Sequence, residues 1–209
     1  MNRTRNASGI NSYEQDFNFK PQQYLQAIIE ENGHASWLDL CCGHGNALQQ
    51  TADFFYKTGQ QQMVYLKGID LIDTFPATPS NITCLNFLAA SLAGWQENMR
   101  YDLITCVHGL HYIGDKLKLL ETAVTALEKS GLFIGNIDLN NLMIDGKNNN
   151  DYFKKIIKEN DFLHNSRKNL LQRTGNSPIR FNLKYIGADD ISGPNYTGQD
   201  SVTSYYSSL

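Results

Sequence analysis

The chain has 209 residues, of which 41% are hydrophobic and 19% are charged, values that are ordinary for one globular domain with a sizeable core. Its net charge of −3 argues against a dedicated nucleic-acid-binding protein. No stretch reaches the roughly 18 apolar residues of a membrane-spanning helix. Residues 1–12 lack the apolar segment of a secretion signal, so we expect a cytoplasmic protein without a membrane partner.

The N-terminal segment, residues 1–20, is predicted to be a flexible lead to a single domain that covers residues 21–209. The lead carries an aromatic cluster of Tyr13, Phe17 and Phe19. Such a cluster could fold over a bound ligand as a lid or simply pack on the edge of the domain.

Helices and strands are predicted to alternate from residue 21 to residue 137. Pro21 begins the first helix and Gly33 ends it, which are the positions that proline and glycine favour. Apolar spacing then predicts a strand over 36–42, a helix over 48–55, a strand over 64–70, a loop over 71–81, a strand over 82–86, a helix over 88–95, a strand over 102–108, a helix over 117–127 and a strand over 132–137. Five strands alternating with helices indicate a parallel sheet with right-handed crossovers.

The C-terminal part is predicted to contain a helix over 151–160, a shorter helical piece over 166–172, and two late strands over 179–186 and 201–206. No helix is predicted between the two late strands, so they should pair antiparallel, with the last strand beside the fifth. Residues 143–184 contain nine lysines and arginines but only four acidic residues. We interpret this excess as a solvated surface, with a patch for an anionic partner as the less favoured alternative.

The four cysteines, Cys41, Cys42, Cys84 and Cys106, all lie in strand-like apolar runs. Their spacing fits neither a zinc site nor a disulfide framework. We therefore expect free thiols and no metal.

Four predicted strands end in residues that suit ligand binding. Asp39 precedes a loop with Gly43 and Gly45, Asp70 ends the second strand, Asn86-Phe87 ends the third, and the run 107–112 ends the fourth. The carboxyl ends of parallel strands share one edge of a sheet, where ligands bind. The glycines allow the backbone to approach a ligand closely, and the following helix presents free N–H groups.

The residue types at these ends suit a nucleoside that carries a cationic amino group. Asp39 stands where an NAD-type fingerprint has an apolar residue, and an acid there favours such a cation. Asp70 can accept hydrogen bonds from ribose hydroxyls, and the amide of Asn86 suits an adenine edge. Leu71 and Phe87 can flank the adenine faces.

These motifs resemble those of the class I S-adenosylmethionine-dependent methyltransferase family. The first family motif matches residues 38–45, the ribose acid matches Asp70, the adenine-side acidic position matches Asn86, and the fourth motif matches residues 102–112. Two departures are visible: Cys41 stands at the first glycine of the glycine-rich loop, with Asn46 or Ala47 at its last, and the helix between the second and third strands is reduced to a turn.

The resemblance implies an α/β fold with a Rossmann-like, seven-stranded, mostly parallel sheet, an antiparallel last strand and helices on both faces, in a three-layer sandwich. It implies S-adenosylmethionine as the cofactor and S-adenosylhomocysteine as its product. The cofactor-binding residues that it implies are Asp39, Cys41, Gly43, Gly45, Asn46, Asp70, Leu71, Asn86, Phe87 and Val107.

Methyl transfer from a sulfonium is an in-line displacement, and positioning of the reactants supplies most of the acceleration. An oxygen or nitrogen acceptor must also lose a proton, so His108 and His111 are the candidate catalytic bases. Candidate substrate contacts are Tyr13, Tyr112, Asp138 and Tyr196. The acceptor is expected to be a small molecule, and the protein a monomer or a homodimer.

Three other interpretations stay open at this level. The same fold could methylate a protein or an RNA through the basic span. A nicotinamide-dependent oxidoreductase is disfavoured because Leu48 stands where the third glycine of its fingerprint is needed. A non-catalytic nucleotide-binding module would bind the cofactor without turnover.

Overall fold

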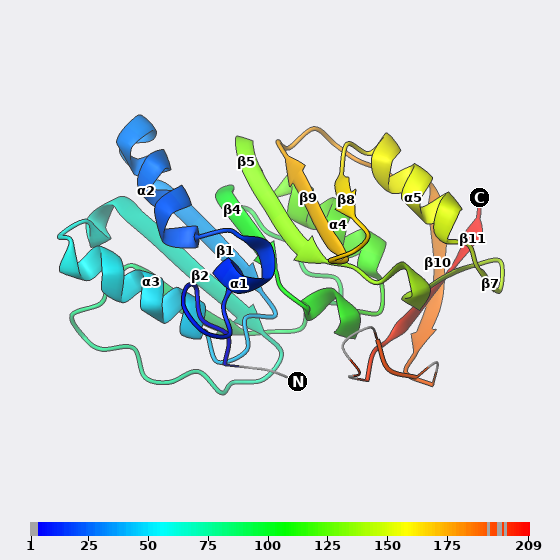
Figure 1. Ribbon diagram of the computed structural model, residues 1–209, viewed down its shortest axis with the longest axis horizontal. Coiled ribbons are helices and arrows are strands. Elements are labelled where there is room, and N and C mark those ends of the chain that lie inside the picture. The colour runs from blue at the N-terminus through cyan, green and yellow to red at the C-terminus, as the bar shows by residue number, and fades with distance from the viewer. Residues whose placement is uncertain (1–3, 192, 196–197, 199) are drawn as a thin grey trace.

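The computed structural model describes residues 4–191, 193–195, 198 and 200–209, which form a central sheet flanked by helices and a smaller second sheet (Figure 1). The helices are α1 (Tyr13–Phe17), α2 (Pro21–Asn32), α3 (Asn46–Lys57), α4 (Lys116–Thr125) and α5 (Asn150–Glu159), with short 3₁₀ turns η1 (Gln61–Met63), η2 (Gly109–Tyr112) and η3 (Leu139–Asn141). Within these described residues, no helix has the length and apolar character to cross a membrane.

The central sheet has seven strands in the order β3-β2-β1-β4-β5-β9-β8. Their bounds are β1 (Ala35–Leu40), β2 (Val64–Asp70), β3 (Leu85–Ala89), β4 (Tyr101–Cys106), β5 (Leu127–Asn136), β8 (Leu163–Asn165) and β9 (Leu170–Thr174). Strands β1 to β5 are mutually parallel, and β9 runs antiparallel to β5 and to β8. The predicted fold class, a seven-stranded and mostly parallel Rossmann-like sheet, is thus confirmed.

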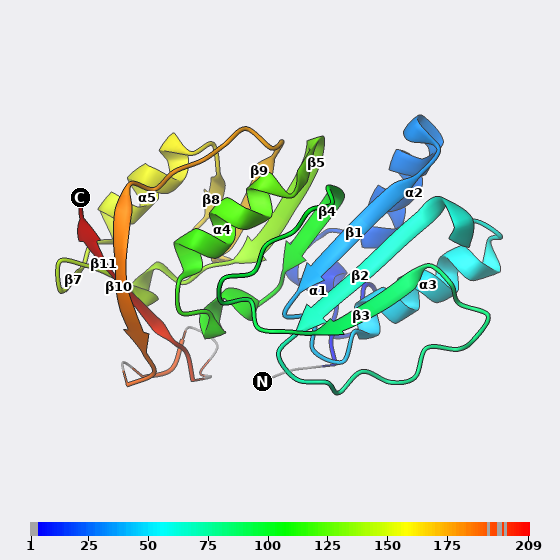
Figure 2. The same cartoon turned by 180° about the vertical axis from the view of Figure 1, so that it is seen from behind.

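Helices cover both faces of this sheet (Figures 1 and 2). On one face α2 and α3 bury an apolar cluster that includes Leu25, Leu48 and Phe55, and on the other α4 buries Leu120 and Val124. A strand enclosed on both faces needs apolar residues throughout, and all six residues of β1 and of β4 are buried. The three-layer arrangement therefore follows from the composition of the central strands.

The third strand begins three residues later than predicted, and the expected helix over 88–95 is wrong. The chain stays extended and pairs with β2 from Leu85 to Ala89, which places Ala89 opposite Asp70. After Ala89 it continues without a helix to β4, and Gly94 adopts a left-handed φ of 70°. Pairing along β2 outweighs the helical spacing of Leu88, Ser91 and Trp95, because a helix beginning at Leu88 would leave the end of β2 unpaired.

The helical piece predicted over 166–172 is also wrong, and so is the position predicted for the last strand. Residues 163–174 form the hairpin β8–β9, whose second strand pairs with β5. The late strands β10 (Leu183–Asp189) and β11 (Thr203–Ser208) do pair antiparallel, as expected. They belong to a separate sheet of order β10-β11-β6-β7, with β6 (Leu142–Ile144) and β7 (Lys147–Asn148), because β9 already occupies the edge of β5.

A buried lysine joins the second sheet to the start of α4. The Lys116 ammonium donates to the carbonyl oxygens of Ile113 and Val202, at 2.9 Å and 2.6 Å, and to the Ser204 hydroxyl at 2.9 Å. Burial lowers the pKa of Lys116 to about 7, against the attraction of Asp138 and Asp115. This contact fixes where β10 and β11 lie relative to the edge of the central sheet.

The segment that we expected to be a flexible lead carries helix α1, whose Tyr13 and Phe17 are buried. Ser12 caps this helix by accepting the N–H of Gln15. The Ala7 N–H donates to the Gln50 side chain of α3 at 2.9 Å, which anchors the start of the segment. Residues 4–20 therefore pack on the domain, and whether they open as a lid stays a prediction.

Candidate functional site

The loop between β1 and α3 is held in a left-handed conformation at three positions. The φ angles are 56° at Cys41, 61° at Gly43 and 73° at Gly45, after which α3 begins at Asn46. At Gly45 a Cβ atom would lie 2.2 Å from the Phe87 ring, so glycine is required there for space as well as for conformation. The free N–H groups of the first turn of α3 face the end of this loop.

Asp70 lies beside this loop at the end of β2, and its side chain is buried. One carboxylate oxygen accepts the Gly43 N–H at 2.9 Å, and the other accepts the Ile72 N–H at 3.2 Å. A carboxylate has about four acceptor positions, so two backbone donors leave capacity for a ligand. The hydrogen bond from the Gly43 N–H therefore holds the glycine loop and the Asp70 carboxylate in a fixed relative position.

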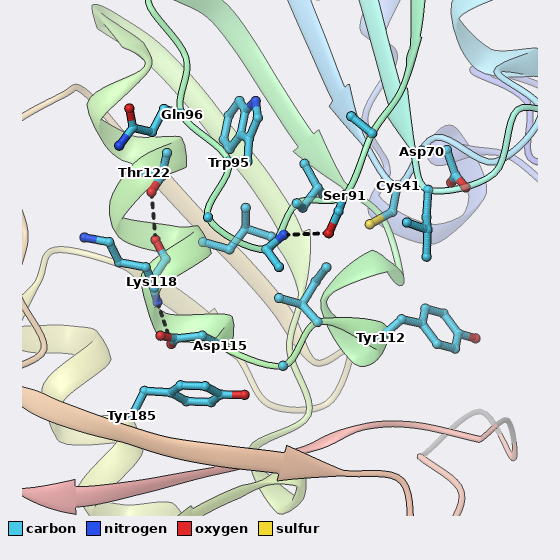
Figure 3. Close-up of a pocket in the computed structure, with 18 of the residues that line it drawn as sticks. Cys41, Asp70, Ser91, Trp95, Gln96, Tyr112, Asp115, Lys118, Thr122 and Tyr185 are labelled. Carbon is cyan, nitrogen blue, oxygen red and sulfur yellow. Dashed lines mark hydrogen bonds between the residues drawn. The ribbon is translucent and has the colours of Figure 1, made fainter.

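A cavity of about 860 Å³ extends from Asp70 to α4 (Figure 3). Asp70 and Cys41 lie at one end, and Trp95, Gln96, Thr122 and Tyr185 lie toward the other. It is lined by Cys41, Asp70, Leu71, Ile72, Ala90, Ser91, Leu92, Ala93, Gly94, Trp95, Gln96, Tyr112, Ile113, Gly114, Asp115, Lys118, Leu119, Thr122 and Tyr185.

The cavity owes its length to the missing helix between β3 and β4. Four of its lining residues recur at the spacing of one helix face: Asp115, which is the N-cap of α4, and Lys118, Leu119 and Thr122 on the helix itself. A crossover helix after β3 would ordinarily pack on that side of the sheet. Because residues 90–100 form an extended loop instead, this face of α4 stays open to the cavity.

Asp39 is buried beneath the loop and is not among the residues that line the cavity. Its two carboxylate oxygens accept hydrogen bonds from the Tyr13 hydroxyl at 2.7 Å and the Thr105 hydroxyl at 2.6 Å. Burial raises the pKa of Asp39 to about 7, although both hydrogen bonds favour the charged form. The arrangement argues against the predicted direct grip on a cationic amino group and makes Asp39 an anchor for the N-terminal segment.

The two candidate bases differ in exposure. His108 retains a side-chain exposure of 24%, adopts a left-handed φ of 56°, and has its Nε2 atom 3.8 Å from the Asp16 carboxylate. Burial, followed by the charge of Arg5, lowers the pKa of His108 to about 4. His111 is fully buried, and burial with the nearby charges of His108 and Lys116 lowers its pKa to about 3. Both rings are neutral at pH 7. His108 is partly exposed, and neither histidine is among the residues that line the cavity.

Of the other predicted cofactor contacts, Leu71 lines the cavity, whereas Gly43, Gly45, Asn46 and Val107 are not among its lining residues. Asn86 and Phe87 do not lie at the end of their strand. Asn86 is exposed in the middle of β3, opposite Lys67. Phe87 stacks on Phe75 at a ring distance of 4.6 Å and fills the space next to Gly45. The structure therefore separates Asn86 and Phe87 from the cavity.

The predicted substrate contacts are dispersed. Tyr112 lines the cavity, whereas Tyr13 packs against Trp37 and donates a hydrogen bond to Asp39. Asp138 is buried and caps η3 by accepting the Asn140 N–H at 3.0 Å. Tyr196 lies outside the described residues. Among the described residues, no group of three or more His, Cys, Asp or Glu side chains is arranged to hold a metal ion.

Sequence reasoning missed the residues that form most of the cavity wall. Ala90 and Ser91 follow the true end of β3, Trp95 comes from the helix-free loop, Lys118 from α4 and Tyr185 from β10. For the first two, the sequence offers only the apolar run from Leu85 to Ala89, and that run does not mark where the pairing of β3 with β2 ends. Nothing in the sequence places Tyr185 beside α4.

Residues 12–172 match a family model described as a methyltransferase domain. No curated protein matches the chain at a significant level.

Several solved methyltransferases are similar in part. The plantazolicin methyltransferase BpumL, solved with a substrate analogue and SAH, is 18% identical over 71% of this chain and 52% of its own, with a TM-score of 0.44. Coclaurine N-methyltransferase, bound to N-methylheliamine and SAH, is 14% identical over 62% of this chain and 37% of its own, with a TM-score of 0.41. The amino pentose methyltransferase CalS10 from Micromonospora echinaspora is 16% identical over 55% and 48%, with a TM-score of 0.39. The chain thus spans about half or less of the lengths of these proteins.

Proposed function

The chain belongs to the methyltransferase domain family, and from that premise we propose that it transfers a methyl group from S-adenosylmethionine to an oxygen or nitrogen atom of a small molecule. The observation that carries the proposal is Asp70, held against the Gly43 N–H at the mouth of a large cavity. A fixed acid at the second strand end, next to a left-handed glycine loop, is the arrangement that binds a ribose.

The residues present fit this cofactor. The Asp70 carboxylate keeps acceptor capacity for ribose hydroxyls after its two backbone contacts. Leu71, Ala90, Ser91 and Leu92 surround the adjoining part of the cavity, and their largely apolar character suits an adenine ring. In this proposal Ala90 and Ser91 take the place at the adenine that the sequence had assigned to Asn86.

S-adenosylmethionine supplies a methyl group that is already activated on a sulfonium, with a neutral leaving group. The protein then has to bind, orient and exclude water. The glycine loop and the first turn of α3 supply backbone donors, and the Gly43 contact holds them in register with Asp70. A fixed site of this kind holds the methyl group and the attacking atom of the substrate in the geometry that the reaction needs.

His108 is the favoured general base, which takes the proton that the substrate loses when it is methylated. Its ring is neutral at pH 7 and partly exposed, with a pKa lowered to about 4. A pKa that low makes it a modest base, so the proposal gives most of the rate to positioning. Burial argues against His111 in the same role, and His111 instead packs under the loop that carries His108, with ring centroids 5.9 Å apart.

A small-molecule acceptor is supported by the volume of the cavity and by the net charge of −3. Methylation of an RNA through the basic span 143–184 is the second candidate. That alternative requires association that weakens steeply with salt, because phosphate contacts release counterions. Titration of RNA at two salt concentrations separates the two substrate classes.

The test of the proposed function is calorimetric titration of the purified chain with S-adenosylhomocysteine and, separately, with NADH. We expect binding of the first compound alone. Asp70→Ala should weaken that binding by about 1–3 kcal/mol, since bound hydroxyls lose their acceptor. Asp73→Ala is the matched control because Asp73 is an exposed carboxylate three residues away and should leave the affinity unchanged. If both variants bind S-adenosylhomocysteine with equal affinity, Asp70 does not bind the ribose.

Catalysis is tested by incubating the protein with S-adenosylmethionine and panels of small hydroxyl and amine acceptors. Mass spectrometry should detect S-adenosylhomocysteine together with a product that is one methyl group heavier. Cofactor binding without turnover for any acceptor would favour the non-catalytic module.

A further inference from the structure

Two thiols from neighbouring strands meet beneath the glycine loop. Cys41 directly follows β1, and Cys106 is the last residue of β4, the strand that pairs with β1. The pairing of Asp39 with Thr105 places Cys41 one residue beyond the position opposite Cys106. A disulfide spans Cα separations of about 4.4–6.8 Å, which includes neighbours offset by one residue on paired strands.

Gly109 makes the room that this pair occupies. A Cβ atom at Gly109 would lie 2.8 Å from the Cys41 sulfur and 2.9 Å from the Cys106 sulfur, closer than atoms approach in proteins. Both sulfurs therefore face the same small space, left free by the absence of a side chain. The other cysteine of the loop, Cys42, turns toward Gly68 in the neighbouring strand β2 and does not share this space.

The backbone conformation at position 41 favours glycine over cysteine. Its φ of 56° is left-handed, a conformation that a residue with a side chain adopts less readily than glycine. The family resemblance also places a glycine here. A strained residue that glycine would replace at lower energy points to a use for its side chain.

The two thiols differ in access. Cys41 lines the cavity near Asp70, as Figure 3 shows, so a dissolved oxidant reaches it. Cys106 is completely buried, and the adjacent Cys41 thiol together with burial raises the pKa of Cys106. Oxidation of such a pair begins at the accessible sulfur, and the buried thiol reacts only with its oxidised neighbour.

We propose that Cys41 and Cys106 form a reversible disulfide when the protein meets a peroxide. In the first step the Cys41 sulfur attacks the peroxide, an S–O bond forms, the O–O bond breaks, and hydroxide leaves to take up the thiol proton as water. In the second step the Cys106 sulfur attacks the Cys41 sulfenic acid, the S–S bond forms, the S–O bond breaks, and a second water carries away the Cys106 proton. Two thiols are oxidised and one hydrogen peroxide is reduced to two waters.

The strand order gives this bond a consequence for the cofactor site, and this part rests on the proposed function. In the order β2-β1-β4, Asp70 and Cys106 lie on opposite sides of the loop that follows β1. A bond to Cys106 draws Cys41 toward β4, away from Asp70, and so loosens the 2.9 Å contact between Asp70 and the Gly43 N–H. The oxidised protein should therefore bind S-adenosylhomocysteine more weakly, and bound S-adenosylhomocysteine should slow the oxidation by covering Cys41.

The first test is a non-reducing peptide map of the full chain after brief treatment with hydrogen peroxide. We expect a link between the peptides that contain Cys41 and Cys106, retained in Cys42→Ala and Cys84→Ser and lost in Cys41→Gly and Cys106→Ala. The glycine variant relieves the left-handed strain, so it should fold. A bond between Cys41 and Cys42, a bond to Cys84, a bond between two molecules, or stable higher oxidation of Cys41 with a free Cys106 would each overturn the proposal.

The second test is titration with S-adenosylhomocysteine before and after oxidation. Wild-type affinity should fall at least about tenfold and return with dithiothreitol, whereas peroxide should leave the affinity of Cys41→Gly at its own untreated value. Unchanged affinity of a protein that carries the mapped disulfide would overturn the coupling. If the reduced wild type does not bind S-adenosylhomocysteine, the proposed function is wrong. The peptide map would still test formation of the disulfide by itself.

Discussion

The two ends of the cavity are built in different ways. At the Asp70 end, the acid and the glycine loop follow the paired strands β2 and β1, and backbone hydrogen bonds hold them together. At the α4 end, the wall combines a helix-free loop, one helix face and Tyr185 from the second sheet. The Asp70 end depends on residues that follow directly paired strands. The α4 end depends on the absence of a helix between β3 and β4 and on Tyr185, which comes from a strand far along the chain.

The largest expected effect comes from the glycine loop. Gly45→Ala should lower the free energy of unfolding by about 2–4 kcal/mol, because left-handed strain adds to a clash with Phe87. Gly59→Ala is the matched control: its φ of 72° is similar, but no atom lies within 4 Å of the added Cβ. It should lose only about 1–2 kcal/mol of strain. Urea denaturation measures both, and equal losses would mean that the ring of Phe87 moves aside.

The next effect is on turnover. His108→Asn should lower the turnover number about a hundredfold, a usual loss when a general base is removed, and leave the affinity for S-adenosylhomocysteine within about twofold. Asparagine is chosen because it tolerates the left-handed φ of 56°. His164→Asn, in β8, serves as the control. Normal turnover of the His108 variant would show that the acceptor loses its proton without this histidine.

A smaller effect concerns the pH dependence of stability. Burial raises the pKa of Asp39 from 3.8 to about 7, so the folded protein holds a proton that the unfolded chain releases between these values. The contribution of Asp39 is therefore fully present below about pH 4 and declines as the pH rises toward 7. Asp39→Asn keeps a partner for Tyr13 and Thr105 but does not titrate. Urea midpoints of both proteins at pH 5 and pH 8 should show a steeper decline in the wild type, and parallel profiles would contradict the buried protonated acid.

The smallest effect separates the two ends of the cavity directly. Ser91→Phe fills the space next to Asp70 and should weaken S-adenosylhomocysteine binding by about tenfold or more, whereas Thr122→Phe fills the α4 end and should change it less than about twofold. Both side chains are replaced by the same ring, so only the position differs. A stronger loss in the Thr122 variant would move the cofactor to the α4 end.

Sequence patterns predicted the first end of the site well. The bounds predicted for β2 agree with the structure, α2 begins at Pro21 and is capped by Gly33, and Asp70 lies beside the glycine loop as expected. These features depend on short-range rules: strand burial, helix capping and the backbone freedom of glycine. Asn86 was misplaced because an apolar run of extended chain gives no local signal of where its pairing ends.

The sequence by itself determined the parallel sheet, the glycine loop and the acid at the end of the second strand, because periodicity and backbone sterics act over a few residues. The tertiary structure decided which strand covers the edge of β5, how far the cavity extends, and that Asp39 bonds to Tyr13 instead of facing a ligand. Those outcomes depend on competition among distant segments for the same edge, face or hydrogen-bond partner, and no local pattern records the result of such a competition.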